Sequence, residues 1–116
     1  MEICGGRQGD PPIIDAVLLG MGPDGHTCSL FPGHVMLQET SLWVSSLEDS
    51  PKPPLCRISL TLPVVNAAKL VCFVATGQGK AELLPRVRAG DTSLPCALVQ
   101  PAKAEWFVDS AAASKL

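Results

Sequence analysis

An aspartate and a histidine lie two residues apart in a glycine-rich segment, and together they could perform acid–base chemistry. The segment reads Gly20-Met21-Gly22-Pro23-Asp24-Gly25-His26. Histidine changes its charge near neutral pH and is the commonest general base, and a neighbouring carboxylate such as Asp24 can orient its ring. The spacing is equally compatible with a structural role, in which Asp24 caps the turn and His26 fills a polar niche.

The three glycines have the G-x-G-x-x-G spacing of a dinucleotide-binding loop, so a nucleotide site is the first alternative. Such a site also needs a continuous helix directly after the motif and an acidic residue about 20 positions further on, at the end of the next strand. Here Pro32-Gly33 interrupts the helical segment, and Glu39, near that distance, lies in a segment that reads as helix or loop. The glycine spacing by itself is therefore weak evidence for a nucleotide.

Two basic residues could hold an anionic ligand near this segment. Lys80 follows a second glycine turn, Thr76-Gly77-Gln78-Gly79. A lysine beside free backbone N–H groups is suited to binding phosphate. Arg57 begins a strand of alternating polar and apolar side chains and could reach the same crevice. Solvated surface side chains are the plain alternative for both residues.

Two apolar segments, 13–19 and 70–75, are predicted to be strands, and each runs into one of the glycine turns. We expect the first strand to be buried on both faces, which is typical of a parallel sheet. Further strands are expected at 42–47, 57–62 and 106–108, and helical segments at 26–31, 34–39, 64–68, 80–89 and 111–115. The alternation predicts an α/β fold with a mostly parallel sheet sandwiched by helices. Such sheets bind ligands at the carboxyl ends of their strands, where both glycine turns lie.

Two of these elements carry expectations about candidate site residues. A helix at 26–31 would place His26 at its positively polarised end, which favours the neutral, proton-accepting imidazole. In the strand 57–62, the apolar side chains should face the core and the polar ones should face outward. The polar side chains of this strand are Arg57, Ser59 and Thr61.

The composition indicates a folded domain and excludes several classes of protein. The chain has 116 residues, is 47% hydrophobic and has a formal net charge of −2, so it can bury a core and lacks the basic character of a nucleic-acid binder. Its five cysteines are widely spaced without a C-x-x-C pair. That pattern argues against a zinc site or a disulfide framework and favours reduced thiols. No signal pattern or membrane-spanning segment appears, so we expect a cytoplasmic protein without a membrane partner.

The last three residues, Ser114-Lys115-Leu116, have the form of a peroxisomal address. Such a signal is read only at a true, exposed C-terminus. The alternative is a chance ending of an alanine-rich segment. A peroxisomal location therefore stands beside the cytoplasmic one.

Longer segments around these motifs carry a family resemblance. They are LLGMGPDGHTCSLFP at 18–32, SPKPP at 50–54, RISLTLPVVNAAK at 57–69, FVATGQGKAELL at 73–84, LPCALVQP at 94–101 and WFVDSAAA at 106–113. Together they resemble the 6-phosphogluconolactonase family, and the first is a specific family signature. The resemblance implies the α/β fold shared with glucosamine-6-phosphate deaminase.

The resemblance also implies a reaction and roles for the candidate residues. The reaction is hydrolysis of 6-phospho-D-glucono-1,5-lactone to 6-phosphogluconate, in the oxidative pentose phosphate pathway, without a metal or nucleotide cofactor. His26 is the implied general base with Asp24 beside it, and Lys80 and Arg57 are the implied contacts of the substrate phosphate. The loop is expected to be shaped by its glycines, Gly20, Gly22 and Gly25.

Family members also carry an N-terminal half that is not visible in this chain. We therefore expect residues 13–116 to be the C-terminal portion of such a domain, after an irregular lead-in at 1–12, with apolar surface that a missing half would cover. One alternative is a truncated, non-catalytic isoform or remnant. A lesser alternative is a sugar-phosphate deaminase or isomerase, although residues 27–32 after the histidine fit the lactonase pattern better.

Overall fold

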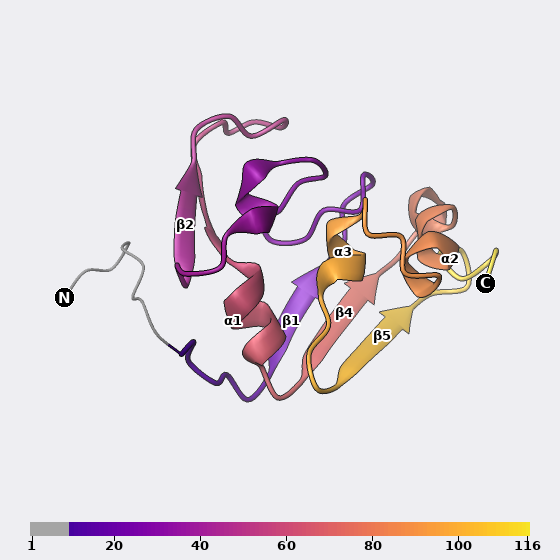
Figure 1. The fold of residues 1–116 in the computed structure, drawn as a ribbon. Helices are drawn as coiled ribbons and strands as arrows, with labels where there is room; N and C mark the ends of the chain where they lie inside the picture. Colours follow the sequence, from indigo (N-terminus) through magenta and orange to yellow (C-terminus); the bar gives the residue numbers. More distant parts are fainter. Residues whose placement is uncertain (1–9) are drawn as a thin grey trace.

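The centre of the molecule is a three-stranded parallel sheet. The computed structural model describes residues 10–116, so most of the predicted lead-in lies outside the described residues. The strand order is β1–β4–β5, with β1 at Val17–Gly20, β4 at Val71–Ala75 and β5 at Ala104–Val108. All three strands point toward the same edge (Figure 1). The predicted α/β fold with a mostly parallel sheet is confirmed.

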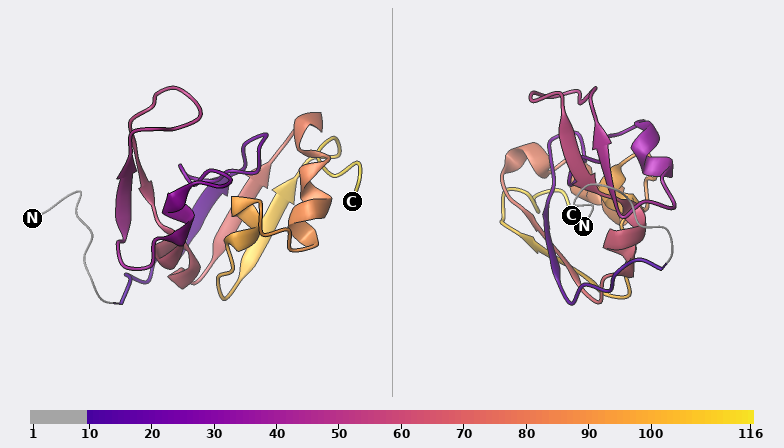
Figure 2. Two further views of the ribbon diagram at one scale, coloured as in Figure 1. Left: turned by 45° about the horizontal axis from the view of Figure 1, so that its top comes forward. Right: turned by 90° about the vertical axis from the view of Figure 1, so that its left-hand side faces the viewer.

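Helices connect these strands and cover one face of the sheet. The described residues form α1 (Leu62–Ala67), α2 (Leu83–Arg88), α3 (Pro95–Leu98) and the 3₁₀ segments η1 (Val35–Gln38) and η2 (Gln78–Lys80). In Figures 1 and 2, α1 and α3 lie over the same face of the sheet. On this face the rings of Phe73 and Trp106 stack with centroids 4.0 Å apart. Side chains from all three helices complete the core, among them Leu62, Val65, Leu83, Leu84, Cys96 and Ala97.

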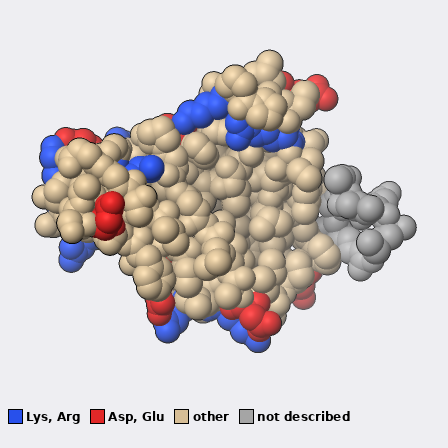
Figure 3. Space-filling view, turned by 180° about the vertical axis from the view of Figure 1, so that it is seen from behind, with Lys and Arg blue, Asp and Glu red and all other residues tan. Residues whose placement is uncertain are grey.

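The opposite face of the sheet has no cover among residues 10–116. Leu18, Val74 and Phe107, on neighbouring strands, are 76%, 52% and 55% exposed. In Figure 3, which views the molecule from behind, the middle of this face is free of Lys, Arg, Asp and Glu, which gather at its margins. The expectation that the first strand is buried on both faces is therefore wrong. Both crossovers advance the sheet in the same direction, so their common right-handedness puts the connecting helices on a single face.

A separate hairpin stands beside the sheet, next to β1 (Figure 2). It pairs β2 (Val44–Leu47) with β3 (Arg57–Leu60) in antiparallel register, which the sequence did not reveal. The facing predicted for this strand is only partly observed: Leu60 packs against the core and Leu62 lies in it, as expected, but Ile58 does not. Ile58 is 64% exposed, whereas Ser59 and Thr61 are 6% and 0% exposed.

The burial of Ser59 and Thr61 follows from the backbone groups with which their hydroxyls form hydrogen bonds. Ser59 Oγ accepts a hydrogen bond from the backbone N–H of Ser29 at 3.0 Å, and Thr61 Oγ1 donates to the carbonyl of Leu42 at 2.6 Å. Buried N–H and C=O groups of a loop need hydrogen-bond partners. Ser59 and Thr61 provide them, so these two polar side chains face inward.

Three predicted helical segments differ from the structure. Residues 26–31 form a tight turn, closed by the N–H of Leu30 on the carbonyl of Thr27 at 2.9 Å, in which Cys28 has a left-handed φ of 52°. That conformation cannot continue a helix, so His26 does not begin one. The segment 80–89 is divided between η2 and α2, and 111–115 forms turns. The short helix α3 was not anticipated.

A matched pair of substitutions tests the one-sided cover of the sheet. Phe73→Ala removes a ring that is 1% exposed and should lower the free energy of unfolding by about 3–5 kcal/mol. Phe107→Ala, on the adjacent strand but on the open face, should change it by only about 0.5 kcal/mol. Urea unfolding followed by circular dichroism measures both values. Equal losses would show that the open face is buried in solution.

Candidate active site

The loop that follows β1 folds back on itself through its own backbone. Gly22 N donates to the carbonyl of His26 at 2.9 Å, and Gly25 N donates to the carbonyl of Gly22 at 3.0 Å. The carbonyl of Gly25 accepts from Cys96 N, in α3, at 3.1 Å. Gly25 has a left-handed φ of 84°, and a Cβ there would lie 2.8 Å from Leu94. Glycine is therefore required at this position, where the loop docks on α3.

Asp24 and His26 form a direct pair inside this loop. Nδ1 of His26 contacts Oδ1 of Asp24, and the same oxygen accepts the backbone N–H of His26 at 3.2 Å. Burial alone would raise the pKa of Asp24, but the hydrogen bonds from His26 outweigh it, so this pKa lies below its ordinary value. An ionised carboxylate only accepts hydrogen bonds, so Nδ1 of the ring carries the proton. Nε2 of a neutral His26 is then the nitrogen that can accept one.

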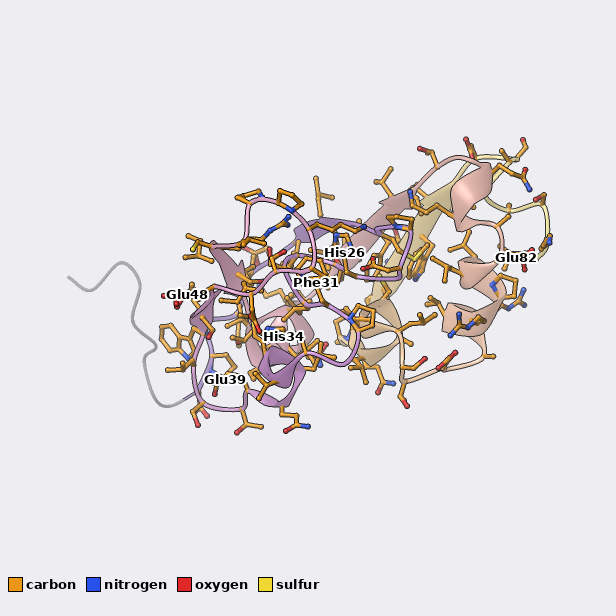
Figure 4. The ribbon with its side chains drawn as sticks, turned by 90° about the horizontal axis from the view of Figure 1, so that it is seen from above. His26, Phe31, His34, Glu39, Glu48 and Glu82 are labelled. Carbon is orange, nitrogen blue, oxygen red and sulfur yellow. The ribbon has the colours of Figure 1, made fainter. Side chains whose placement is uncertain are left out.

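The imidazole of His26 lies close to the Gly22 backbone and to an aromatic ring. Its centroid lies 4.7 Å from that of Phe31, and Figure 4 shows the two side chains together. A Cβ on Gly22 would clash with two ring atoms of His26, so the ring reaches this position only because residue 22 is glycine. A pocket of about 330 Å³ opens beside the ring, lined by Gly20, Met21, Gly22, His26, Thr27 and Cys28.

Arg57 lies near this pair but is engaged by a neighbouring loop. Its guanidinium carbon lies 5.4 Å from the centroid of the Phe31 ring. Nε donates to the carbonyl of Pro54 at 3.0 Å, and Nη2 donates to the carbonyls of Lys52 at 3.1 Å and Pro53 at 3.0 Å. The structure thus places Arg57 beside the site, with most of its hydrogen bonds holding the proline-rich loop between β2 and β3.

Lys52 is a residue of the site that the sequence analysis missed. Its Nζ lies 3.9 Å from Oδ1 of Asp24. The segment SPKPP was noted as a family motif, but nothing in its local pattern shows which part of the fold a loop lysine approaches. A charged residue inside a proline-rich segment of a specific motif is the signal that could have drawn attention to it.

Lys80 belongs to the second glycine turn, at the carboxyl end of β4. The carboxylate of Asp109 accepts the N–H of Gly77 at 3.1 Å and that of Ala112 at 2.8 Å, which ties this turn to the segment after β5. In Figure 4, Glu82, two residues beyond Lys80, lies well away from His26. Within residues 10–116, no hydrogen bond or ion pair joins Lys80 to the His26 loop. The two turns share one edge of the sheet.

Residues 10–116 contain no group of three His, Cys, Asp or Glu side chains that could hold a metal ion. None of the helices in this part of the chain is long and apolar enough to cross a membrane. The four described cysteines are free thiols. Burial raises the pKa of Cys96, behind the His26 loop, to about 12, so this thiol stays protonated at neutral pH.

Comparison with known proteins places the chain in a family. The sequence model described as glucosamine-6-phosphate isomerases/6-phosphogluconolactonase matches residues 2–108. The chain belongs to this family. The resemblance drawn from the motifs is thereby confirmed.

Individual relatives are similar over nearly the whole chain. The 6-phosphogluconolactonase of Rattus norvegicus is 56% identical over 113 residues, which is 94% of this chain and 44% of that protein. The crystal structure of devB protein has a TM-score of 0.82 at 31% identity and covers 98% of this chain and 49% of that one. A 6-phosphogluconolactonase from Trypanosoma cruzi has a TM-score of 0.77 at 30% identity, covering 99% and 46%. The chain thus spans about half the length of the relatives it matches.

Substitution of Gly22 tests how the imidazole is held. In Gly22→Ala, the new methyl group must displace the His26 ring, with an expected loss of about 1–3 kcal/mol of stability from overpacking. The ring resonances of His26 in NMR spectra should shift with it. Gly20→Ala is the matched control, because a Cβ there has no neighbour within 4 Å. Unchanged His26 resonances in Gly22→Ala would contradict the close approach.

Proposed function

We propose that this chain carries the general base of a lactonase site and acts in hydrolysis of 6-phospho-D-glucono-1,5-lactone to 6-phosphogluconate. The observation that supports the proposal most directly is the Asp24–His26 pair beside an open pocket. It occurs in a chain 56% identical to a 6-phosphogluconolactonase over the matched residues. The family membership and the geometry of this pair together support the proposal.

The arrangement suggests a short sequence of proton transfers at His26. Nε2 takes a proton from water while the water oxygen attacks the lactone carbonyl carbon, and Asp24 stabilises the imidazolium that forms. The tetrahedral intermediate then collapses, the bond from the carbonyl carbon to the ring oxygen breaks, and the ring oxygen takes the proton from His26. The loop glycines Gly22 and Gly25 keep the imidazole in place during both steps.

The substrate phosphate is assigned to the second glycine turn. We propose Lys80 as its main contact, because the turns after β1 and β4 lie at the same edge of the sheet and a sugar phosphate can extend between them. Arg57 is proposed as a further anion contact. Its described hydrogen bonds use Nε and Nη2, which leaves Nη1 for a ligand oxygen.

The open face of the sheet supports a proposal about a partner. Parallel sheets are normally covered on both faces, and Leu18, Val74 and Phe107 are exposed here. The matched lactonase has more than half of its length outside the match, since the chain covers 44% of it. We infer that further polypeptide of the same fold packs on this face. The second candidate function is a non-catalytic remnant. The exposed face of the sheet favours it if no further polypeptide packs there.

A turnover assay separates the two candidates. Lactone hydrolysis is followed with the purified chain, alone and mixed with the unmatched part of the rat lactonase. We expect the mixture to exceed both the chain alone and the spontaneous rate, and His26→Gln to lower the catalysed rate by about 10²–10⁴-fold. His34→Gln is the matched control, because His34 pairs with Asp49 at 2.8 Å, outside the loop. If neither preparation hydrolyses the lactone faster than the spontaneous reaction, the lactonase proposal is wrong and the non-catalytic remnant is the remaining candidate.

We further propose that the C-terminal Ser114-Lys115-Leu116 is read as a peroxisomal address on a protein otherwise cytoplasmic. Leu116 is 55% exposed, but Lys115 contacts Glu82, and Leu116 N donates to the carbonyl of Ala113 at 3.0 Å. A receptor must therefore release this tail from Glu82, the residue before α2. A fluorescent fusion at the N-terminus should enter peroxisomes, more completely with Glu82→Gln, and remain outside when Leu116 is deleted. An unchanged location on deletion would contradict the proposal.

A further inference from the structure

We propose that the Lys52 ammonium binds the carbonyl end of the ligand, beside His26, as a cation separate from the phosphate contact Lys80. The oxygen it would meet is the lactone carbonyl oxygen as it becomes negative, and a carboxylate oxygen in the hydrolysed product. This inference rests on the proposed function, but the binding experiment that tests it requires no turnover.

The backbone of Lys52 is held on both sides. Its carbonyl accepts from Ser50 Oγ at 2.7 Å and from Arg57 Nη2 at 3.1 Å, and its N–H donates to Ser50 Oγ at 3.2 Å. Ser50 is 3% exposed, and its own N–H closes the loop on the carbonyl of Leu55 at 3.1 Å. The loop therefore presents this side chain from a defined position.

Arg57 provides much of this support because the loop is rich in proline. Prolines lack a backbone N–H, so the segment around Pro53 and Pro54 cannot satisfy its own carbonyls as a strand would. The guanidinium has several donors in a fixed plane and reaches three consecutive carbonyls, from Lys52 to Pro54. Arg57 is therefore a positioning residue for Lys52.

The side chain of Lys52 leads to the Asp24–His26 pair and keeps its donors. Its Nζ lies 3.9 Å from Oδ1 of Asp24, which is beyond hydrogen-bond distance. That oxygen already accepts two N–H groups of His26. The ammonium is thus held near the pair by charge, and its three N–H groups remain available to a ligand oxygen. The Lys52 side chain is 40% exposed, so a ligand can reach it.

The position assigns Lys52 to the reacting end of the ligand. In the lactone, the carbonyl carbon and the phosphate lie at opposite ends of the sugar chain. A water activated by His26 must attack the carbonyl carbon, and we assign to the nearby Lys52 ammonium the oxygen on which negative charge develops. Lys80, on the other turn, faces the phosphate end.

The experiment compares two ligands that differ only at the carbonyl end. 6-Phosphogluconate has a carboxylate there, and glucitol 6-phosphate has a hydroxymethyl group and the same phosphate. Their affinities are measured by isothermal titration calorimetry for the full chain and for Lys52→Met, Lys80→Met and Lys69→Met. Lys69 is the matched control, because it is 65% exposed, pairs with Asp15 and lies at the amino end of β4, away from the site.

We expect Lys52→Met to lower the affinity for 6-phosphogluconate about tenfold, which is the loss of about one charged hydrogen bond. The affinity for glucitol 6-phosphate should not change. Lys80→Met should lower the affinities for both ligands by the same factor, and Lys69→Met should lower neither affinity. Lys52→Arg should restore part of the 6-phosphogluconate affinity. Melting temperatures within about 2 °C of the unaltered chain would show that the variants are folded.

The outcomes separate this inference from the lactonase proposal. Equal weakening of both ligands by Lys52→Met, or weakening of neither, would overturn the inference, as would an unaltered chain that binds neither ligand. Selective loss of 6-phosphogluconate affinity without any turnover would support Lys52 in this role and contradict the lactonase activity of the chain.

Discussion

The candidate site depends on one carboxylate oxygen, Oδ1 of Asp24. It accepts both the ring and the backbone N–H of His26, and so determines which ring nitrogen can take up a proton. The bare backbone of Gly22 leaves room for the ring, and Phe31 packs against it. Each of these contacts lies within residues 22–31, and the loop that contains them is docked on α3 through Gly25 and Cys96.

The surroundings of this pair depend instead on the hairpin. Polar side chains of β3 and its flanks turn inward because the loops they meet have backbone groups without partners. Ser59 accepts a hydrogen bond from the turn after His26, and Arg57 donates hydrogen bonds to the proline-rich loop. These hydrogen bonds bring the loop that carries Lys52 against the loop that carries Asp24. The hydrogen bonds of Ser59 and Arg57 are thus the means by which the two loops meet.

The sheet explains how the site is attached to the fold and what the fold still exposes. Parallel strands end at one edge, so the turns after β1 and β4 lie together there (Figure 1). The crossovers cover one face and leave Leu18, Val74 and Phe107 open to solvent. This agrees with relatives about twice as long as the matched region, such as the rat lactonase, of which the chain covers 44%.

The sequence by itself determined the family, the apolar strands, the glycine turns and the pairing of a carboxylate with His26. These features depend on residue type and on spacing over a few positions, which act through backbone freedom and side-chain periodicity. Only the tertiary structure decided that Leu18 faces solvent, that residues 26–31 form a turn, that Arg57 holds a loop and that Lys52 approaches Asp24. Which face is covered and which loops meet are set by crossover handedness and by hydrogen bonds between distant segments, and no local pattern encodes them.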